Sequence, residues 1–207
     1  MATLREKLGS LLDSLSEELL RGYRCLLIAR EIRDAQGERK LAPAAQFFST
    51  VQEACMREAF LSVAKLAISE RESITIEYLL NAAGQVPSKF FPFATREEID
   101  NTIEVHRGQL EELTPVIDDL KLQRDRVLAH LDRKHVNEPE TISSQSIESQ
   151  QIERCFDVFL GIINTYRRYF GETELGFEQV VNDLREEVGY LVERLQVRDY
   201  EAGQDSI

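Results

Sequence analysis

The sequence has no tryptophan, only five prolines and ten glycines, and three cysteines among 207 residues. The scarcity of proline and glycine, with abundant Leu, Ala, Glu, Arg and Gln, favours helices. Three widely spaced cysteines argue against a disulfide framework or a zinc site. We therefore expect Cys25, Cys55 and Cys155 to be reduced packing residues.

Long apolar runs and a signal-peptide core are also lacking, because no stretch approaches the roughly 18–20 apolar residues that cross a bilayer. We therefore expect a cytoplasmic protein with no membrane partner. The net charge of −12 argues against a large non-specific nucleic-acid surface, which needs clustered Lys and Arg. A small local anion site remains compatible with this charge.

Apolar residues recur at helical spacing through most of the chain, as in the series Leu4, Leu8, Leu11, Leu15 and Leu19. The pattern predicts helices over residues 2–35, 44–70, 75–82, 95 to between 131 and 135, 152–170 and 177–197. We expect an all-α fold, an antiparallel helical bundle of about five main helices with one or two short extra helices. A single domain would cover residues 1–197, with a disordered tail over 198–207.

Local signals support these limits. Thr95 and Glu98 have the spacing of a capping box at a helix start, and Gly171 is placed to end a helix. The aromatic residues Phe90, Phe91 and Phe93 lie in a loop marked by Gly84, Pro87 and Pro92, where they either pack locally or dock on a partner. The buried side of the second helix is predicted to comprise Phe47, Phe48, Val51, Cys55, Phe60, Ala64 and Ala67.

Residues 121–135 form a basic segment in an acidic protein. Five Lys and Arg against two Asp give this segment a net charge of +3, so the other residues carry −15. Such a positive island indicates an anion partner. Arg124 also interrupts an apolar stripe of Ile117, Leu120, Val127 and Leu131, where a charged residue needs a carboxylate, a phosphate or a subunit boundary. Alternatively, Arg124 pairs with a Glu of a neighbouring helix, and the cations offset the helix dipole.

The run Arg124-Asp-Arg-Val-Leu-Ala-His130 resembles the signature of the HEPN superfamily of helical ribonucleases and nucleotide-binding proteins. That signature is an Arg and a polar residue followed, after four to six positions, by a His near the end of a long helix. The continuation Ala-His-Leu-Asp-Arg-Lys is similar to the phage abortive-infection (Abi U-type) branch. The layout of residues 4–170 also resembles the family, although Asp125 stands where Asn is more familiar.

The residue types suit metal-independent RNA cleavage. His130 would act as general base and acid, and Arg124 would clamp the phosphate. Asp125 would orient the substrate or one of these groups, while Lys121, Arg126, Arg133 and Lys134 would bind RNA phosphates. No metal ligand set, cofactor motif or phosphate-binding loop is expected.

A spacing of six residues turns a regular helix by about 600°, so the Arg124 and His130 side chains would point about 120° apart. Either the helix unwinds near Ala129 or two chains complete the site. The resemblance implies the second, a homodimer through the motif-bearing helix.

We therefore expect a HEPN-type endoribonuclease, a toxin or phage-defence effector that cleaves RNA, with an antitoxin or a nucleotidyltransferase as a candidate partner. The alternatives are a non-catalytic HEPN-like module that binds a nucleotide, RNA or protein, and a purely structural bundle.

Overall fold

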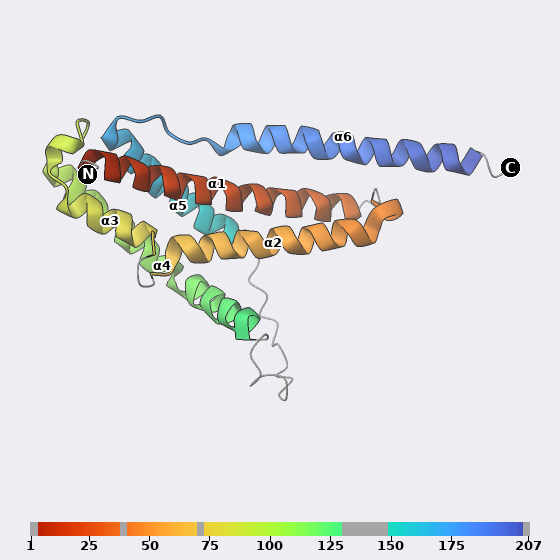
Figure 1. The fold of residues 1–207 in the computed structure, drawn as a ribbon, viewed down its shortest axis with the longest axis horizontal. Coiled ribbons are helices and arrows are strands. Elements are labelled where there is room, and N and C mark those ends of the chain that lie inside the picture. The colour runs from red at the N-terminus through yellow and green to blue at the C-terminus, as the bar shows by residue number, and fades with distance from the viewer. Residues whose placement is uncertain (1–3, 38–40, 70–72, 130–148, 205–207) are drawn as a thin grey trace. The chain divides into compact units, whose positions relative to one another are not determined.

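The computed structural model describes residues 4–37, 41–69, 73–129 and 149–204. These residues form six α-helices and two short 3₁₀ helices, and no strand occurs among them, which confirms the all-α prediction. The α-helices, shown in Figure 1, are α1 (Leu4–Gly37), α2 (Ala45–Ala67), α3 (Ile76–Gln85), α4 (Arg96–Ala129), α5 (Ser149–Phe170) and α6 (Phe177–Gln204). The 3₁₀ helices are Ala42–Ala44 and Ser88–Phe90.

The chain divides into two compact units. The first comprises Met1–Leu19 and Phe60–Leu175, and the second Leu20–Ala59 and Gly176–Ile207. Because α1 and α2 pass from one unit to the other, each contributes residues to both cores.

The core of the first unit is built around α5, whose apolar stripe has the helical spacing that the sequence predicts. Helices α3, α4 and α5 pack on one another. Arg167 of α5 joins this group to α1, with contacts of 3.3 Å each to Asp13 and Ser16. The buried residues of α5 are Ile152, Cys155, Phe156, Phe159, Ile162, Ile163, Tyr166 and Phe170.

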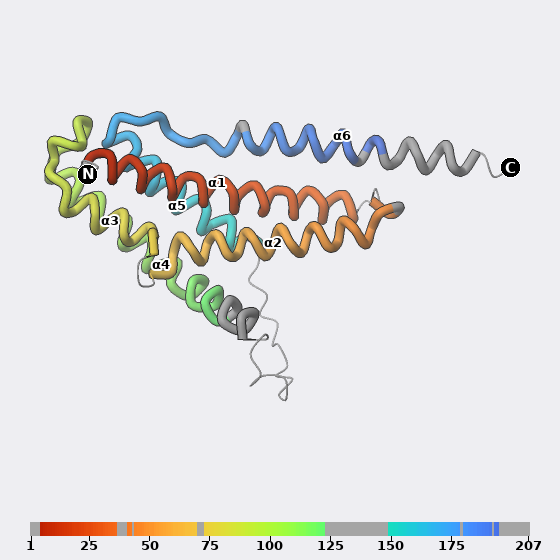
Figure 2. Tube along the Cα trace, in the orientation of Figure 1, coloured from red at the N-terminus to blue at the C-terminus, as the bar shows by residue number. Residues whose placement is uncertain are grey.

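In the second unit, α6 runs parallel to α1, as Figure 2 shows. Tyr23 stacks on Phe177 with ring centroids 3.6 Å apart, and further along both helices Glu31 pairs with Arg185 at 3.2 Å. Val188 then packs against the cluster formed by Ile32, Ala35 and Leu41. The helix continues to Gln204, whereas the sequence predicts its end at Val197.

The buried side of helix α2 differs in part from the prediction. Phe47 was expected to be buried, but its side chain is 64% exposed, with its ring edge-to-face against Phe48. Phe48 packs on the cluster around Ile32, and Phe47 points elsewhere because one residue turns a helix by about 100°. Of the predicted side, Val51, Cys55, Phe60 and Ala67 are half-buried and Ala64 is buried, while the most buried residues are Ala59, Ser62, Val63 and Leu66.

The segment that follows α3 and the residue that ends α5 lie close together. Phe91 is buried, Phe90 half-buried and Phe93 exposed, so the three aromatic residues do not form one surface. Gly171 ends α5 with a φ of +88°, which confirms the predicted cap. A Cβ at this position would come within 2.9 Å of the Phe93 ring, so the backbone here needs glycine for space as well as for conformation.

Candidate functional site

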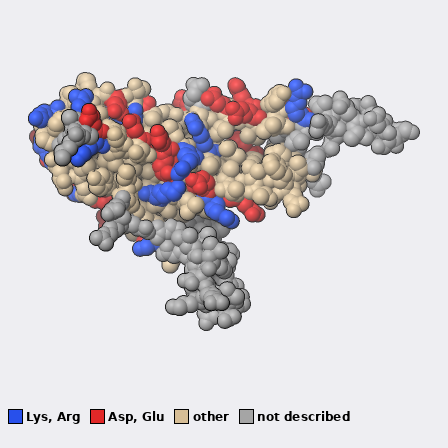
Figure 3. Space-filling view, viewed as in Figure 1, with Lys and Arg blue, Asp and Glu red and all other residues tan. Residues whose placement is uncertain are grey.

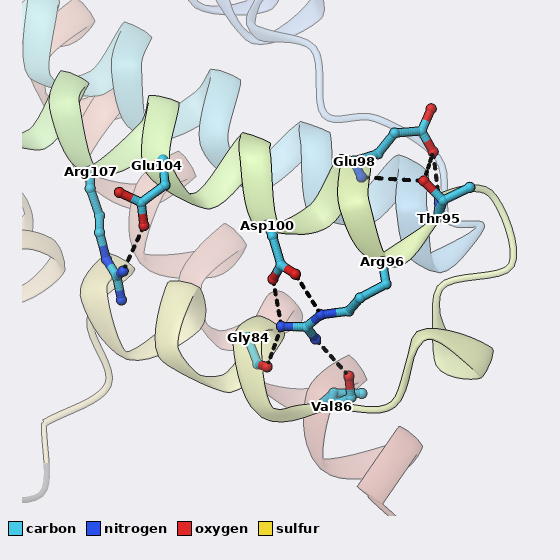
Figure 4. A network of polar contacts seen from close by, with 8 residues as sticks. All are labelled: Gly84, Val86, Thr95, Arg96, Glu98, Asp100, Glu104 and Arg107. Carbon is cyan, nitrogen blue, oxygen red and sulfur yellow. Dashed lines mark hydrogen bonds and ion pairs between the residues drawn. The ribbon is translucent and has the colours of Figure 1, made fainter.

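The candidate site lies at the C-terminal end of α4, and the opposite end of that helix is firmly anchored. Thr95 accepts a hydrogen bond from the Glu98 amide at 3.2 Å, and the Glu98 carboxylate accepts one from the Thr95 amide at 2.7 Å (Figure 4). This confirms the predicted capping box. The hydrogen bonds from the Thr95 amide and hydroxyl lower the pKa of Glu98, because they stabilise its carboxylate.

Arginine side chains hold the first half of α4 against α3, and Figure 4 shows the contacts of Arg96. Arg96 pairs with Asp100 through Nε at 2.9 Å and donates to the Gly84 carbonyl at 2.7 Å, where α3 ends. Arg107 donates to Asn81 of α3 at 2.9 Å and pairs with Glu77 at 3.7 Å. The amino-terminal half of α4 is therefore fixed in position.

Three contacts define how α4 runs against α5. The hydroxyls of Thr102 and Tyr169 lie 2.9 Å apart, the rings of His106 and Tyr166 have centroids 5.5 Å apart, and Arg154 pairs with Glu112 at 3.0 Å. Residue numbers rise along α4 as they fall along α5. The two helices are therefore antiparallel.

This register places Arg124 beyond the first residue of α5. By the Thr102–Tyr169 and His106–Tyr166 contacts, Ser149 lies level with residues 122 and 123 of α4. Helix α4 continues to Ala129 and thus extends past the start of α5 by about 10 Å, with Arg124 in the first turn of this extension. Figure 1 draws the last turns of α4 projecting away from α5.

Burial follows the helical period along α4 up to residue 122. Leu113 and Leu120 are buried, but the next two residues, Lys121 and Leu122, are exposed. The backbone of Arg124, Asp125 and Arg126 is helical, whereas their side chains lie outside the described residues. His130, Arg133 and Lys134 lie outside the described residues altogether.

His106 is a titratable residue on α4 that the sequence interpretation missed. It is buried, and neither its Nδ1 nor the hydroxyl of the adjoining Tyr166 has a hydrogen-bond partner among the described residues. Burial lowers the pKa of His106, which favours the neutral imidazole. Its burial could have been inferred, because position 106 lies at helical spacing between Ile103 and Leu110 on the apolar side of α4.

On the face that Figure 3 shows, Lys and Arg side chains lie next to Asp and Glu side chains. Over the part of the chain that the structure describes, no three His, Cys, Asp or Glu residues gather as a metal site would require. None of the described helices combines the length and the apolar character needed to cross a membrane.

The comparisons with known proteins agree with the predicted resemblance. The family model HEPN_AbiU2, described as AbiU2, matches residues 5–191. No curated protein and no solved structure matches the chain. Because the match covers most of the sequence, including the motif at the end of α4, the chain belongs to the HEPN_AbiU2 family and is an abortive-infection module of the HEPN type.

Proposed function

We propose that this protein is a metal-independent endoribonuclease of the HEPN type that acts as a toxin or phage-defence effector. The observation that carries the proposal is the position of the motif. Arg124 and Asp125 lie on the part of α4 that extends past the start of α5, two and three residues after the exposed Leu122. We expect a site there to be accessible to a long polyanion, in contrast to the buried His106.

The motif supplies the two functions that RNA cleavage requires without a metal. His130 removes the proton from a ribose 2′-hydroxyl and returns a proton to the leaving oxygen, because its ordinary pKa lies near neutrality. Arg124 binds the phosphate through two parallel N–H donors and stabilises the charge that develops in the transition state. Lys121, Arg126, Arg133 and Lys134 hold the flanking phosphates, and Asp125 orients the substrate or Arg124.

A homodimer through the end of α4 completes this site. Because a regular helix directs Arg124 and His130 about 120° apart, one chain's helix brings only one of them toward a given phosphate. A second copy of α4 packed on this extension by two-fold symmetry would bring both motifs into one cleft. An antitoxin or nucleotidyltransferase partner would act by covering the same end.

The test compares the wild-type protein with His130→Ala and with a matched control, His135→Ala, which alters the other histidine of the segment. We expect wild-type and His135→Ala to arrest growth on expression and fragment total RNA, and His130→Ala to do neither. Purified wild-type protein should cleave RNA in EDTA. Intact RNA with folded wild-type protein, or equal cleavage by His130→Ala, would refute the nuclease proposal.

One residue favours a second candidate, a non-catalytic module that binds RNA, a nucleotide or a protein. Asp125 places a negative charge beside Arg124, which weakens contact with phosphate and lowers activity. In this case Arg124→Ala would abolish binding of the partner, whereas His130→Ala would leave binding unchanged. RNA binding without cleavage by the wild-type protein would support this candidate over the first.

A further inference from the structure

Two of the three cysteines face each other in the second unit. Cys25 of α1 donates a side-chain hydrogen bond to the sulfur of Cys55 of α2, and both are half-buried. The third cysteine, Cys155, is fully buried on α5 in the first unit. The chain therefore contains one thiol pair in contact and one separate, enclosed thiol.

The packing of α1 against α2 explains why the two thiols meet. One turn away, Arg21 pairs with Glu58 at 3.4 Å. In the opposite direction, Ile28 and Val51 pack on the same apolar cluster. The residue numbers of these two pairs each sum to 79 and those of Cys25 and Cys55 sum to 80, so the two cysteines lie at nearly the same level of the antiparallel helices.

Small residues border the pair. Gly22 and Ala59 are both buried beside this contact, and short side chains allow helices to approach closely. Close approach is the condition that a disulfide between two helices requires, because its Cβ atoms must lie about 4 Å apart.

We propose that Cys25 and Cys55 form an oxidisable thiol pair, in which a peroxide oxidises Cys55 and Cys25 resolves the product to a disulfide that joins α1 to α2. The Cys55 thiolate attacks one peroxide oxygen, the O–O bond breaks, and a sulfenic acid and hydroxide result. The Cys25 sulfur then attacks the sulfenic sulfur and displaces the hydroxyl group. In total, two thiols and one hydrogen peroxide give one disulfide and two waters.

The environment of each sulfur assigns these roles. Burial raises the pKa of Cys25 to about 11, and nearby Cys55 and Glu58 contribute to the rise. Burial also raises the pKa of Cys55, but the hydrogen bond donated by Cys25 opposes that rise, because it stabilises the Cys55 thiolate. Cys55 is thus the thiol that ionises first. Since both pKa values are raised, oxidation is slow at neutral pH and accelerates as the pH rises.

In the wild-type chain, Cys155 serves as an internal control for oxidation of the Cys25–Cys55 pair. After treatment with hydrogen peroxide and alkylation of free thiols, we expect peptide mapping to show a Cys25–Cys55 disulfide within one chain, with Cys155 alkylated. The melting temperature should rise on oxidation and return on reduction, because a cross-link restricts the unfolded chain. Disulfides that join two chains, a link to Cys155, or over-oxidation without a disulfide would refute the proposal.

Single substitutions test the assigned roles. Cys25→Ser should trap the sulfenic acid on Cys55, which dimedone then labels, whereas Cys55→Ser should leave Cys25 with several-fold less label. The labelling rate of Cys25→Ser should increase with pH. Equal labelling of the two variants, or stronger labelling of Cys25, would show that the assignment of nucleophile and resolving thiol is wrong.

Discussion

His106 of α4 and Tyr166 of α5 pack with their rings inclined at 69° and their centroids 5.5 Å apart, yet neither His106 Nδ1 nor the Tyr166 hydroxyl has a hydrogen-bond partner among the described residues. The contact is therefore held by apolar packing of two polar rings. A buried polar atom without a partner costs about 1–3 kcal/mol. The two rings fill space in the core, and their unpaired polar atoms lower the stability of the fold.

This arrangement predicts a pH-dependent stability. Because burial lowers the pKa of His106 in the folded chain, the unfolded chain takes up a proton first as the pH falls below about 6.5. Stability is thus complete above that pH and decreases below it. Between pH 6.5 and 5.5 the wild-type protein should lose up to about 1 kcal/mol more than His106→Leu, measured by urea unfolding. Parallel losses in the two proteins would contradict the prediction.

Arg167 and Arg168 provide a matched pair for testing the link between α5 and α1. Arg167 is 14% exposed and contacts Asp13, Glu172 and the Thr173 carbonyl, whereas Arg168 is 60% exposed and pairs only at the surface with Glu174. Arg167→Met should lower the free energy of unfolding by about 1–3 kcal/mol. Arg168→Met should change it by less than about 1 kcal/mol, because surface ion pairs contribute little. Equal effects would show that Arg167 is not an anchor.

Substitutions of two phenylalanines, one buried and one exposed, test the observed burial in the core. Phe159 of α5 is completely buried, so Phe159→Ala should destabilise the protein by about 3–5 kcal/mol. Phe47→Ala should change the stability by no more than about 0.5 kcal/mol, because most of that side chain faces solvent. Thermal and urea unfolding of both variants measure the difference. A large loss in Phe47→Ala would indicate that Phe47 is covered in solution.

Substitution of Asp125 tests the proposed chemistry through an expected increase in activity. Replacing this carboxylate with an amide, Asp125→Asn, removes a negative charge beside the proposed phosphate clamp and introduces the residue more familiar in the family. We expect several-fold faster RNA cleavage, while Asp132→Asn, the control at the other Asp of the basic segment, should have a smaller effect. Slower cleavage by Asp125→Asn would mean that the carboxylate itself takes part in catalysis.

The helix limits could be predicted because their signals are local. The stripe of α5, the capping box of Thr95 and Glu98 and the glycine at position 171 each depend on residues a few positions apart. The family could be recognised because its motif is also a short run of residues. In each case, neighbouring residues in one helix or turn contain the whole signal.

The depth of burial and the partner of each face were decided by the tertiary structure. Periodicity placed Phe47 on the inner side of α2, but the position of the Ile32 cluster left it exposed. The parallel packing of α6 on α1 depends on contacts between residues about 154 positions apart, which no local pattern specifies.

The sequence by itself determined that the chain is helical, that it carries a HEPN motif and where most helices begin and end. Only the tertiary structure decided that α4 extends past the start of α5 near Arg124 and that the side chains of Cys25 and Cys55 are in contact. Both depend on the register between antiparallel helices. That register comes from interlocking side chains on two surfaces, whereas a periodic pattern fixes only the face that each helix presents.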